Sequence, residues 1–380
     1  MQVTRILHSI GQGAFYTEKF ICDNDQYNIV FDCGGSSNVI HHSVRNYCRK
    51  LPKGQDEKGI VDAVFISHFD RDHVNGLKTL FQNSKVLRIF LPLISYNHIL
   101  SINPSFFTLL GDAFYQNLFE SAIEDSPVPI DGTEIIRIRP GNDETNGEYI
   151  ISKNQELRTN IKTIPSLSNT YITHAQLWKF KTFNYEFSIR SNQLQQILLS
   201  SNYTLKLSKI VSNFSKNYRK YRNAISNLYK LVQGTINANS MITYSGPIDN
   251  KISTHLISQV TPQLGLYFYN NINYQLDKSG CMYFGDYTAS DSQMWAEYAK
   301  HFSKEIPLLQ MQQVPHHGSA RDFNSQLCNN PIFHFISAAV GNHYGHPGNQ
   351  VIVDLNNNYS SWAWINQFTQ PDFEFEYTIS

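Results

Sequence analysis

The spacing of apolar residues predicts short buried strands that alternate with amphipathic helices. The run at 27–33 has the composition of a strand and ends at two glycines, and residues 39–51 have the spacing of a helix. The apolar run at 61–67 is short, as expected of a buried strand. Strand and helix patterns continue to alternate through about Arg139, which is typical of a layered α/β domain.

The middle of the chain is basic. Between residues 187 and 248 there is no Asp or Glu, while Lys and Arg recur. Apolar residues in this stretch recur mostly at steps of three and four, which predicts an amphipathic helix with a basic back over about residues 203–232. One interpretation is a contact with nucleic-acid phosphates. It would be made by four cations of this helix, Lys216, Arg219, Lys220 and Arg222.

Two other interpretations of the basic helix stay open. Its charges can form a solvated face while its tyrosines lie in the core, and it can dock an acidic partner protein. Strand patterns resume after it, so we expect one α/β domain with an insertion. The parts are residues 1–145 and 234–380 as the two halves, with residues 146–233 as a basic, mainly helical insertion.

Composition narrows the class of protein. The chain has 380 residues, 41% of them hydrophobic, and no net charge, which excludes global disorder and a wholly basic surface. Five cysteines without a C-x-x-C pair argue against a disulfide scaffold or a thiolate zinc site. The sequence has no signal-peptide pattern and no apolar run that would span a membrane. We therefore expect a soluble cytoplasmic protein.

Metal-ligand residue types are densest directly after the predicted strand at 61–67. His68, Asp70, Asp72 and His73 fall within six residues. Successive side chains of a strand point to opposite faces, so a tight loop is needed to direct all four to one place. Neutral imidazoles and carboxylates bind Zn, Mn or Fe. The competing interpretation is an ordinary polar surface loop.

Three further signals are weak when taken alone. Asp286 follows a glycine at a predicted strand end, where a carboxylate can bridge two metals or sit in an ordinary turn. His316 and His317 follow the next predicted strand, as a ligand and its neighbour or as two solvated turn residues. His346 lies in a Gly-His-Pro sequence that is equally ambiguous.

The order of these motifs is informative. H-x-D-x-D-H, then G-D, H-H-G-S and G-H-P resembles the metallo-β-lactamase domain of the competence protein ComEC and its stand-alone relatives. Three further segments resemble other short elements of that family, namely Ser9–Gly13, Phe31–Gly35 and Asn237–Ser240. The matches span residues 1–140, 234–247 and 280–355.

This resemblance implies an αββα sandwich with a binuclear metal site on its edge. By position, the ligands would be His68 and Asp70 for one ion, Asp72, His73 and His317 for the other, and Asp286 as the bridge. His346 would lie beside the leaving group. A hydroxide bridging the metals would attack phosphorus, Asp72 would help to orient the water, and His346 would protonate the leaving oxygen.

The chain departs from the family pattern in three places. Asp70 stands where most metallo-β-lactamase proteins have His, although relatives of ComEC share the Asp. Arg139-Pro140 replaces an expected His-Pro, so the first metal would be held loosely or by another residue such as His316. Ala14 replaces a frequent acidic residue. Because carboxylate oxygen is a harder ligand than imidazole, we expect Mn²⁺, with Zn²⁺ as its competitor.

Together these patterns predict a binuclear-metal-dependent hydrolase, a nuclease or other phosphodiesterase acting on a nucleic acid or nucleotide. One alternative is a metallohydrolase for a small ester or lactam. Another is a subunit with weak activity that is gated by a protein partner, for example in a defence complex. The motifs specify the chemistry more closely than the leaving group.

Overall fold

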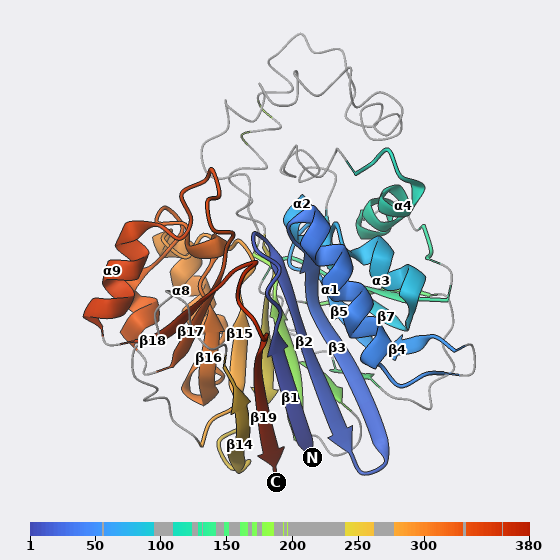
Figure 1. Cartoon of the computed structure of the whole chain (residues 1–380), viewed down its shortest axis with the longest axis horizontal. Coiled ribbons are helices and arrows are strands. Elements are labelled where there is room, and N and C mark those ends of the chain that lie inside the picture. Colours follow the sequence, from blue (N-terminus) through green and yellow to red (C-terminus); the bar gives the residue numbers. More distant parts are fainter. Residues whose placement is uncertain are drawn as a thin grey trace.

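The computed structural model confirms the predicted α/β class, with two large sheets and helices on both sides of them (Figure 1). It describes residues 1–54, 57–94, 109–123, 128–130, 132–141, 148–151, 160–165, 169–172, 177–185, 193, 196, 240–261, 277–329, 332–358 and 360–380. Within these ranges, no helix combines the length and the apolar character that crossing a membrane would need.

The first large sheet has nine strands and mixes strands from both ends of the chain. In spatial order they are β10 (Ile161–Ile164), β8 (Glu134–Ile138), β7 (Arg88–Pro92), β5 (Ala63–Phe65), β3 (Asp25–Gly34), β2 (Ala14–Cys22), β1 (Gln2–Leu7), β19 (Phe373–Ile379) and β14 (Thr254–Val260). The neighbouring strands β3, β5, β7, β8 and β10 run parallel to one another. The remaining neighbouring pairs of this sheet are antiparallel.

The second large sheet has eight strands. In spatial order they are β18 (Ser361–Ile365), β17 (Phe333–Ser337), β16 (Leu309–Gln313), β15 (Gly280–Tyr283), β13 (Ile242–Pro247), β12 (Trp178–Phe183), β11 (Asn169–Ile172) and β9 (Glu148–Ile151). β15 to β18 run parallel, so their carboxyl ends lie at one edge. A separate short ladder pairs β4 (Gly59–Val61) with β6 (Ser84–Val86).

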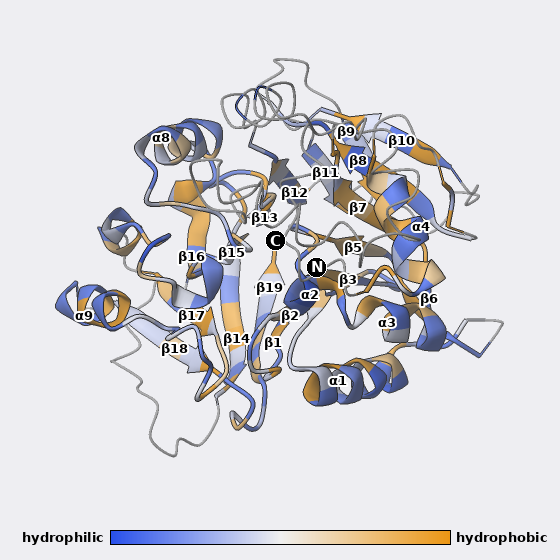
Figure 2. Ribbon diagram, turned by 90° about the horizontal axis from the view of Figure 1, so that it is seen from above, coloured by the Kyte–Doolittle hydropathy of each residue, from blue (hydrophilic) through white to orange (hydrophobic). Residues whose placement is uncertain are grey.

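Three apolar clusters hold the layers together. One packs α1 (Ser37–Lys50), α3 (Leu77–Asn83) and α4 (Ala113–Ala122) on the nine-stranded sheet, and another packs α8 (Ser292–His301) and α9 (Asn349–Asn357) on the eight-stranded sheet. The third joins residues of the two sheets to each other. Figure 2 shows these two helix groups on opposite sides of the strands.

Strand alternation produces this layering. In β3, Val30 belongs to the cluster under α1, while its neighbours Ile29 and Phe31 belong to the cluster between the sheets. In β15, Met282 faces α8, and Tyr283 faces the other sheet. Because side chains alternate along a strand, one apolar run supplies two layers.

The strongest apolar patterns of the sequence match the observed elements. The predicted helix at 39–51 is α1, which buries Ile40, Val44 and Cys48 on one face. The predicted strand at 27–33 lies within β3. The run at 61–67 does not form a single strand, because it is split at Asp62, whose carboxylate accepts a hydrogen bond from the Asn28 backbone at 2.8 Å.

The predicted insertion at 146–233 differs from expectation where the structure describes it. Residues 148–183 contribute β9 to β12, which belong to the two large sheets, so this part is strand and not helix. In β12, Trp178 and Phe180 face the nine-stranded sheet, while Lys179 reaches Glu305. That period of two is a strand pattern. The basic helix predicted at 203–232 lies outside the described residues.

Candidate metal centre

Asp32 fixes the loop that follows β5. Both the backbone N–H and the hydroxyl of Ser67 donate hydrogen bonds to the Asp32 carboxylate, each at 2.7 Å. The same carboxylate lies 2.8 Å from His73 Nδ1, at the end of the loop in the short helix α2 (Arg71–Val74). Holding Nδ1 in this way leaves His73 Nε2 to face the cluster.

Asp286 reaches the same point from the second sheet. It follows β15 and Gly285, whose φ of 54° suits glycine. A Cβ on Gly285 would lie 2.4 Å from Ser240 Oγ, so glycine also allows a close approach. Ser240 Oγ accepts the Asp286 N–H at 2.8 Å and lies 3.0 Å from His68 Nδ1. One hydroxyl thus positions two members of the cluster.

Two adjacent histidines follow β16. His316 and His317 have φ of 49° and 54°, a left-handed backbone that is uncommon outside glycine. His317 Nδ1 lies 2.8 Å from the Ser337 carbonyl oxygen. His316 Nδ1 lies 2.6 Å from Asp322 Oδ2. As with His73, the outer nitrogen of each ring is engaged and Nε2 faces inward.

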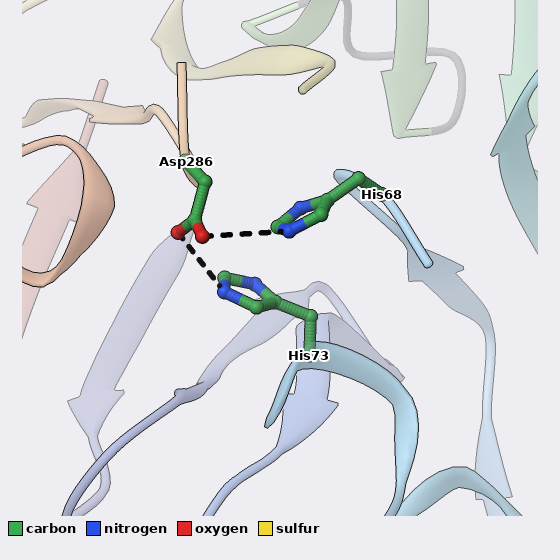
Figure 3. A group of neighbouring side chains, drawn as sticks. All are labelled: His68, His73 and Asp286. Carbon is green, nitrogen blue, oxygen red and sulfur yellow. Dashed lines mark ion pairs between the residues drawn. The ribbon is translucent and has the colours of Figure 1, made fainter. Parts of the chain in front are cut away.

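The two oxygens of Asp286 face different histidine pairs. Oδ1 lies 3.1 Å from His73 Nε2 and 3.4 Å from His317 Nε2. Oδ2 lies 3.6 Å from His68 Nε2 and 3.4 Å from His316 Nε2. Figure 3 shows His68 and His73 directed at separate oxygens of this carboxylate.

Each histidine pair has a second carboxylate beside it. Asp70 Oδ2 lies 3.8 Å from His68 Nε2, and Asp72 Oδ2 lies 3.3 Å from His317 Nε2. The cluster therefore divides into two sets of donor atoms that share Asp286. This division assigns Asp70 and Asp72 to different sets, although one residue separates them in the chain.

These donors fit a pair of divalent ions. Ligands about 2.1 Å from a tetrahedral ion are separated by roughly 3.4 Å. Six nitrogen-to-oxygen separations in the two sets are 3.1–3.8 Å, and His68, His73 and Asp286 also offer ligand atoms within 4.8 Å of one another. His68 Nε2 is buried and has no hydrogen-bond partner among the described residues. All four histidines have Nδ1 within 3.0 Å of an outer partner, the support typical of metal-bound imidazole.

The histidines and aspartates of the cluster shift one another's pKa values. Burial is the largest influence on His68 and lowers its pKa, but Asp286 and Asp70 outweigh burial and raise that pKa to about 9. Burial likewise opposes Asp286 and Asp322 at His316, whose pKa rises to about 9. Burial alone would raise the pKa of Asp286, yet the surrounding histidines hold it well below its usual range. The cluster therefore favours cations between its carboxylates, and a metal ion can take the place of protons.

A pocket of about 460 Å³ opens beside the cluster. His346 lines it, with its ring centroid 5.6 Å from that of His316. Burial, followed by the charges of His316 and His317, lowers the pKa of His346 to about 4. The free side chain is then a neutral imidazole at pH 7, which can donate one N–H hydrogen bond.

The structure brings together the site residues that the sequence suggested along one edge of both sheets. His68, Asp70, Asp72, His73, Asp286 and His317 form the cluster, and His346 lies in the pocket wall. Four predicted substrate-contacting residues lie outside the described residues, namely Lys216, Arg219, Lys220 and Arg222.

Several supporting residues were missed by the sequence reasoning or given too little weight. His316 was suggested only as a substitute ligand and belongs fully to the cluster. Asp32 and Ser240 support histidines, and in the sequence each stands out only because its segment resembles the family. No sequence motif pointed to Asp322, because its partner His316 is in a separate turn.

Comparison with known proteins gives no independent identification. The chain matches no protein-family model, and a search of curated proteins finds no significant match.

Proposed function

We propose that this protein is a binuclear-metal-dependent hydrolase of phosphodiesters, with an αββα fold of the metallo-β-lactamase type that resembles the domain in ComEC. The observation that carries the proposal is the Asp286 carboxylate, each of whose oxygens faces two histidine Nε2 atoms. The two packed sheets with helices outside them support the fold assignment.

Two sets of residues would hold the ions. His68, Asp70 and His316 form one set, Asp72, His73 and His317 form the other, and Asp286 belongs to both. Bound there, divalent ions would supply Lewis acidity, which lowers the pKa of water and neutralises phosphate oxygens. Three carboxylates among seven donors favour Mn²⁺ more than an all-histidine site would, with Zn²⁺ as the competitor.

The chain itself contributes orientation and proton handling. Asp32 and Ser240 fix the rings of His73 and His68, so the donors are arranged before substrate arrives. The Asp72 side chain is 31% exposed and lines the pocket, where one carboxylate oxygen can accept a hydrogen bond from water and orient it. His346 in its neutral form would donate its N–H to the leaving oxygen, which stabilises the charge that develops there.

The test is cleavage of labelled single-stranded DNA, double-stranded DNA, RNA and bis(p-nitrophenyl) phosphate with Mn²⁺, Mg²⁺ or Zn²⁺. We expect metal-dependent cleavage in the wild type and none in the variant carrying Asp72→Ala with His73→Ala. His255→Ala is the matched control, because this exposed histidine lies on β14, outside the cluster.

Metal content is measured on the same samples. Protein that holds two ions per chain and cleaves no phosphodiester would overturn the proposal. Turnover restricted to small carboxylic esters or lactams would replace it with a different hydrolase. Activity that appears only after a partner protein is added would make the chain a gated subunit.

A further inference from the structure

The pocket beside the cluster is lined by residues from both sheets. Arg71 follows the β5 loop of the nine-stranded sheet, and Tyr344 lies in the loop after β17 of the eight-stranded sheet. Neither residue belongs to the donor sets of the cluster. An aromatic ring and a guanidinium can bind parts of a substrate other than the phosphorus atom that is attacked.

Tyr344 is an aromatic surface held over the pocket. It is 60% exposed, and the other large apolar side chains that are exposed among the described residues do not line this pocket. Its ring packs against His343, with centroids 3.9 Å apart. Burial, then the charges of Asp72 and Asp70, raises the pKa of its phenol, so the ring lies within the electrostatic reach of the cluster.

The loop that carries Tyr344 is built around one side chain. Asn342 Oδ1 accepts the backbone N–H groups of Tyr344 at 3.1 Å and of His346 at 3.0 Å. The Asn342 amide also donates to the carbonyl oxygens of Ala339 and His346. The backbones of Tyr344 and His346 are therefore fixed relative to each other. Fixing an aromatic ring beforehand lowers the entropy cost of stacking a ligand on it.

Arg71 supplies a cation to the same pocket. Its Nη2 donates a hydrogen bond to Ser37 Oγ at 3.1 Å, which draws the exposed side chain toward the start of α1. It is the one Lys or Arg among the described residues that line the pocket. A guanidinium carries five N–H donors in a planar fork that matches phosphate oxygens.

We propose that Tyr344 and Arg71 make this pocket a nucleotide subsite, in which Tyr344 stacks on a base and Arg71 binds the neighbouring phosphate. The inference rests on the proposed function, which supplies the phosphate at the cluster. A simple alkyl or aryl phosphodiester has no second phosphate for Arg71, and a sugar–phosphate chain without bases has nothing to stack on Tyr344. A nucleotide chain with at least two phosphates uses both side chains.

Binding is measured first, because it reports the subsite without turnover. Fluorescein-labelled thymidine tetranucleotide is compared by anisotropy with an abasic chain that has the same number of phosphates, both with phosphorothioate linkages that slow cleavage, on protein loaded with Mn²⁺. We expect the wild type to prefer the base-bearing chain by about tenfold, from the strength of base–aromatic stacking. Tyr344→Ala should reduce this preference to near one, while Tyr344→Phe retains it.

The Phe368→Ala variant is the matched control, since Phe368 is 72% exposed and does not line the pocket. An equal loss of affinity for both chains in Tyr344→Ala, or no loss, would overturn the stacking role. Wild type without any preference for bases would do the same. Melting curves check that each variant is folded.

The phosphate contact of Arg71 is tested by measuring affinity at several salt concentrations. Arg71→Gln should weaken both chains alike and lower the slope of log affinity against log salt by about 0.7, the value for one contact to a single-stranded phosphate. Arg71→Lys keeps the charge and should keep the slope. An unchanged slope in Arg71→Gln would overturn the phosphate contact proposed for Arg71.

Cleavage with Mn²⁺ separates this inference from the proposed function. Loss of the base preference in Tyr344→Ala, with no phosphodiester cleaved by the wild type, would support the subsite and overturn the hydrolase. Wild-type cleavage together with an unchanged base preference in Tyr344→Ala would support the hydrolase and overturn the subsite.

Discussion

At the scale of single residues, the cluster depends on backbone conformations that are costly elsewhere. Asp32, His316 and His317 have φ of 52°, 49° and 54°. A left-handed residue other than glycine costs about 1 kcal/mol or more. Asp32 offsets this cost with three hydrogen-bonding contacts, to two groups of Ser67 and to His73. Three of the five left-handed non-glycine residues among those that the structure describes thus belong to the cluster or support it.

Replacing Asp32 tests this support. Asp32→Asn keeps the size and tolerates the left-handed backbone, but its amide N–H₂ cannot accept the hydrogen bonds now received by one carboxylate oxygen. We expect metal affinity, measured by calorimetry, to fall about 10–100-fold. Asp23→Asn is the control, because exposed Asp23 has φ of 53° at the β2–β3 turn. Equal affinities in both variants would contradict the role of Asp32.

Glycine is required where α2 approaches the sheet. A Cβ on Gly34 would lie 2.3 Å from the Asp72 carbonyl carbon and 2.4 Å from His73 N. Gly34→Ala should therefore displace two ligands, lowering metal affinity at least tenfold and stability by about 1–3 kcal/mol.

The control for this variant is Gly111→Ala, since a Cβ at exposed Gly111 would meet nothing within 4 Å. Metal affinity and denaturant unfolding are measured for both variants. If Gly34→Ala binds metal as tightly as Gly111→Ala, the close approach of α2 does not position the ligands.

At the scale of elements, β12 is tied to α8 and the turn that follows it. Lys179 and Lys181 place their ammonium groups 2.6 and 3.1 Å from the Glu305 carboxylate, and Lys181 also donates to the His301 carbonyl oxygen. His301 Nε2 lies 3.1 Å from the Thr182 carbonyl oxygen. A strand from the expected insertion is therefore part of the eight-stranded sheet's own packing.

His301 gives this junction a pH dependence. Burial, followed by the charge of Lys181, lowers its pKa from 6.5 to about 3. Between these values the unfolded chain binds a proton that the folded chain does not, so stability is complete above pH 6.5 and falls as the pH drops. At pH 5 the loss should be about 2 kcal/mol.

The variant His301→Gln can still donate to the Thr182 carbonyl but does not titrate. We expect the fall in unfolding free energy between pH 7 and pH 5 to be smaller in this variant than in the wild type by that amount. His42→Gln, at an exposed position of α1, should leave the fall unchanged. A wild-type fall retained in His301→Gln would assign the acid sensitivity to other groups.

At the scale of the whole molecule, the candidate site exists only when the two sheets are packed. His68 to His73 follow β5 in one sheet, while Asp286 and His317 follow β15 and β16 in the other. A buried ion pair lies between the same sheets, with Arg5 Nε 2.6 Å from Glu18 Oε1. Glu18 also accepts hydrogen bonds from Ser245 and Tyr283 of the second sheet.

Breaking this ion pair should destabilise the packing of the two sheets. Glu18→Ala leaves the fully buried Arg5 without its carboxylate, and we expect a loss of about 3–5 kcal/mol in unfolding free energy. The double variant Arg5→Met with Glu18→Leu should lose less, because it buries no charge. A single variant that loses under about 1 kcal/mol would show that the pair does not stabilise the sheet packing.

The sequence predicted what depends on neighbours along the chain. Helix α1 followed from the apolar spacing of Ile40 and Val44, and the four ligand residues between His68 and His73 were evident because one short loop carries them. The α/β class followed for the same reason. The strands at 148–183 were not foreseen, because their short runs become strands through pairing with distant partners.

Sequence alone therefore determined the α/β class and the kinds of ligand atom available. Only the tertiary structure decided how those atoms are grouped. His73 and His317 are 244 residues apart, yet their Nε2 atoms lie 3.3 Å from each other. That proximity, the membership of His316 and the two-sided position of Asp286 follow from the packing of one sheet on the other. Local spacing cannot encode this packing, because it fixes only the directions of side chains within an element.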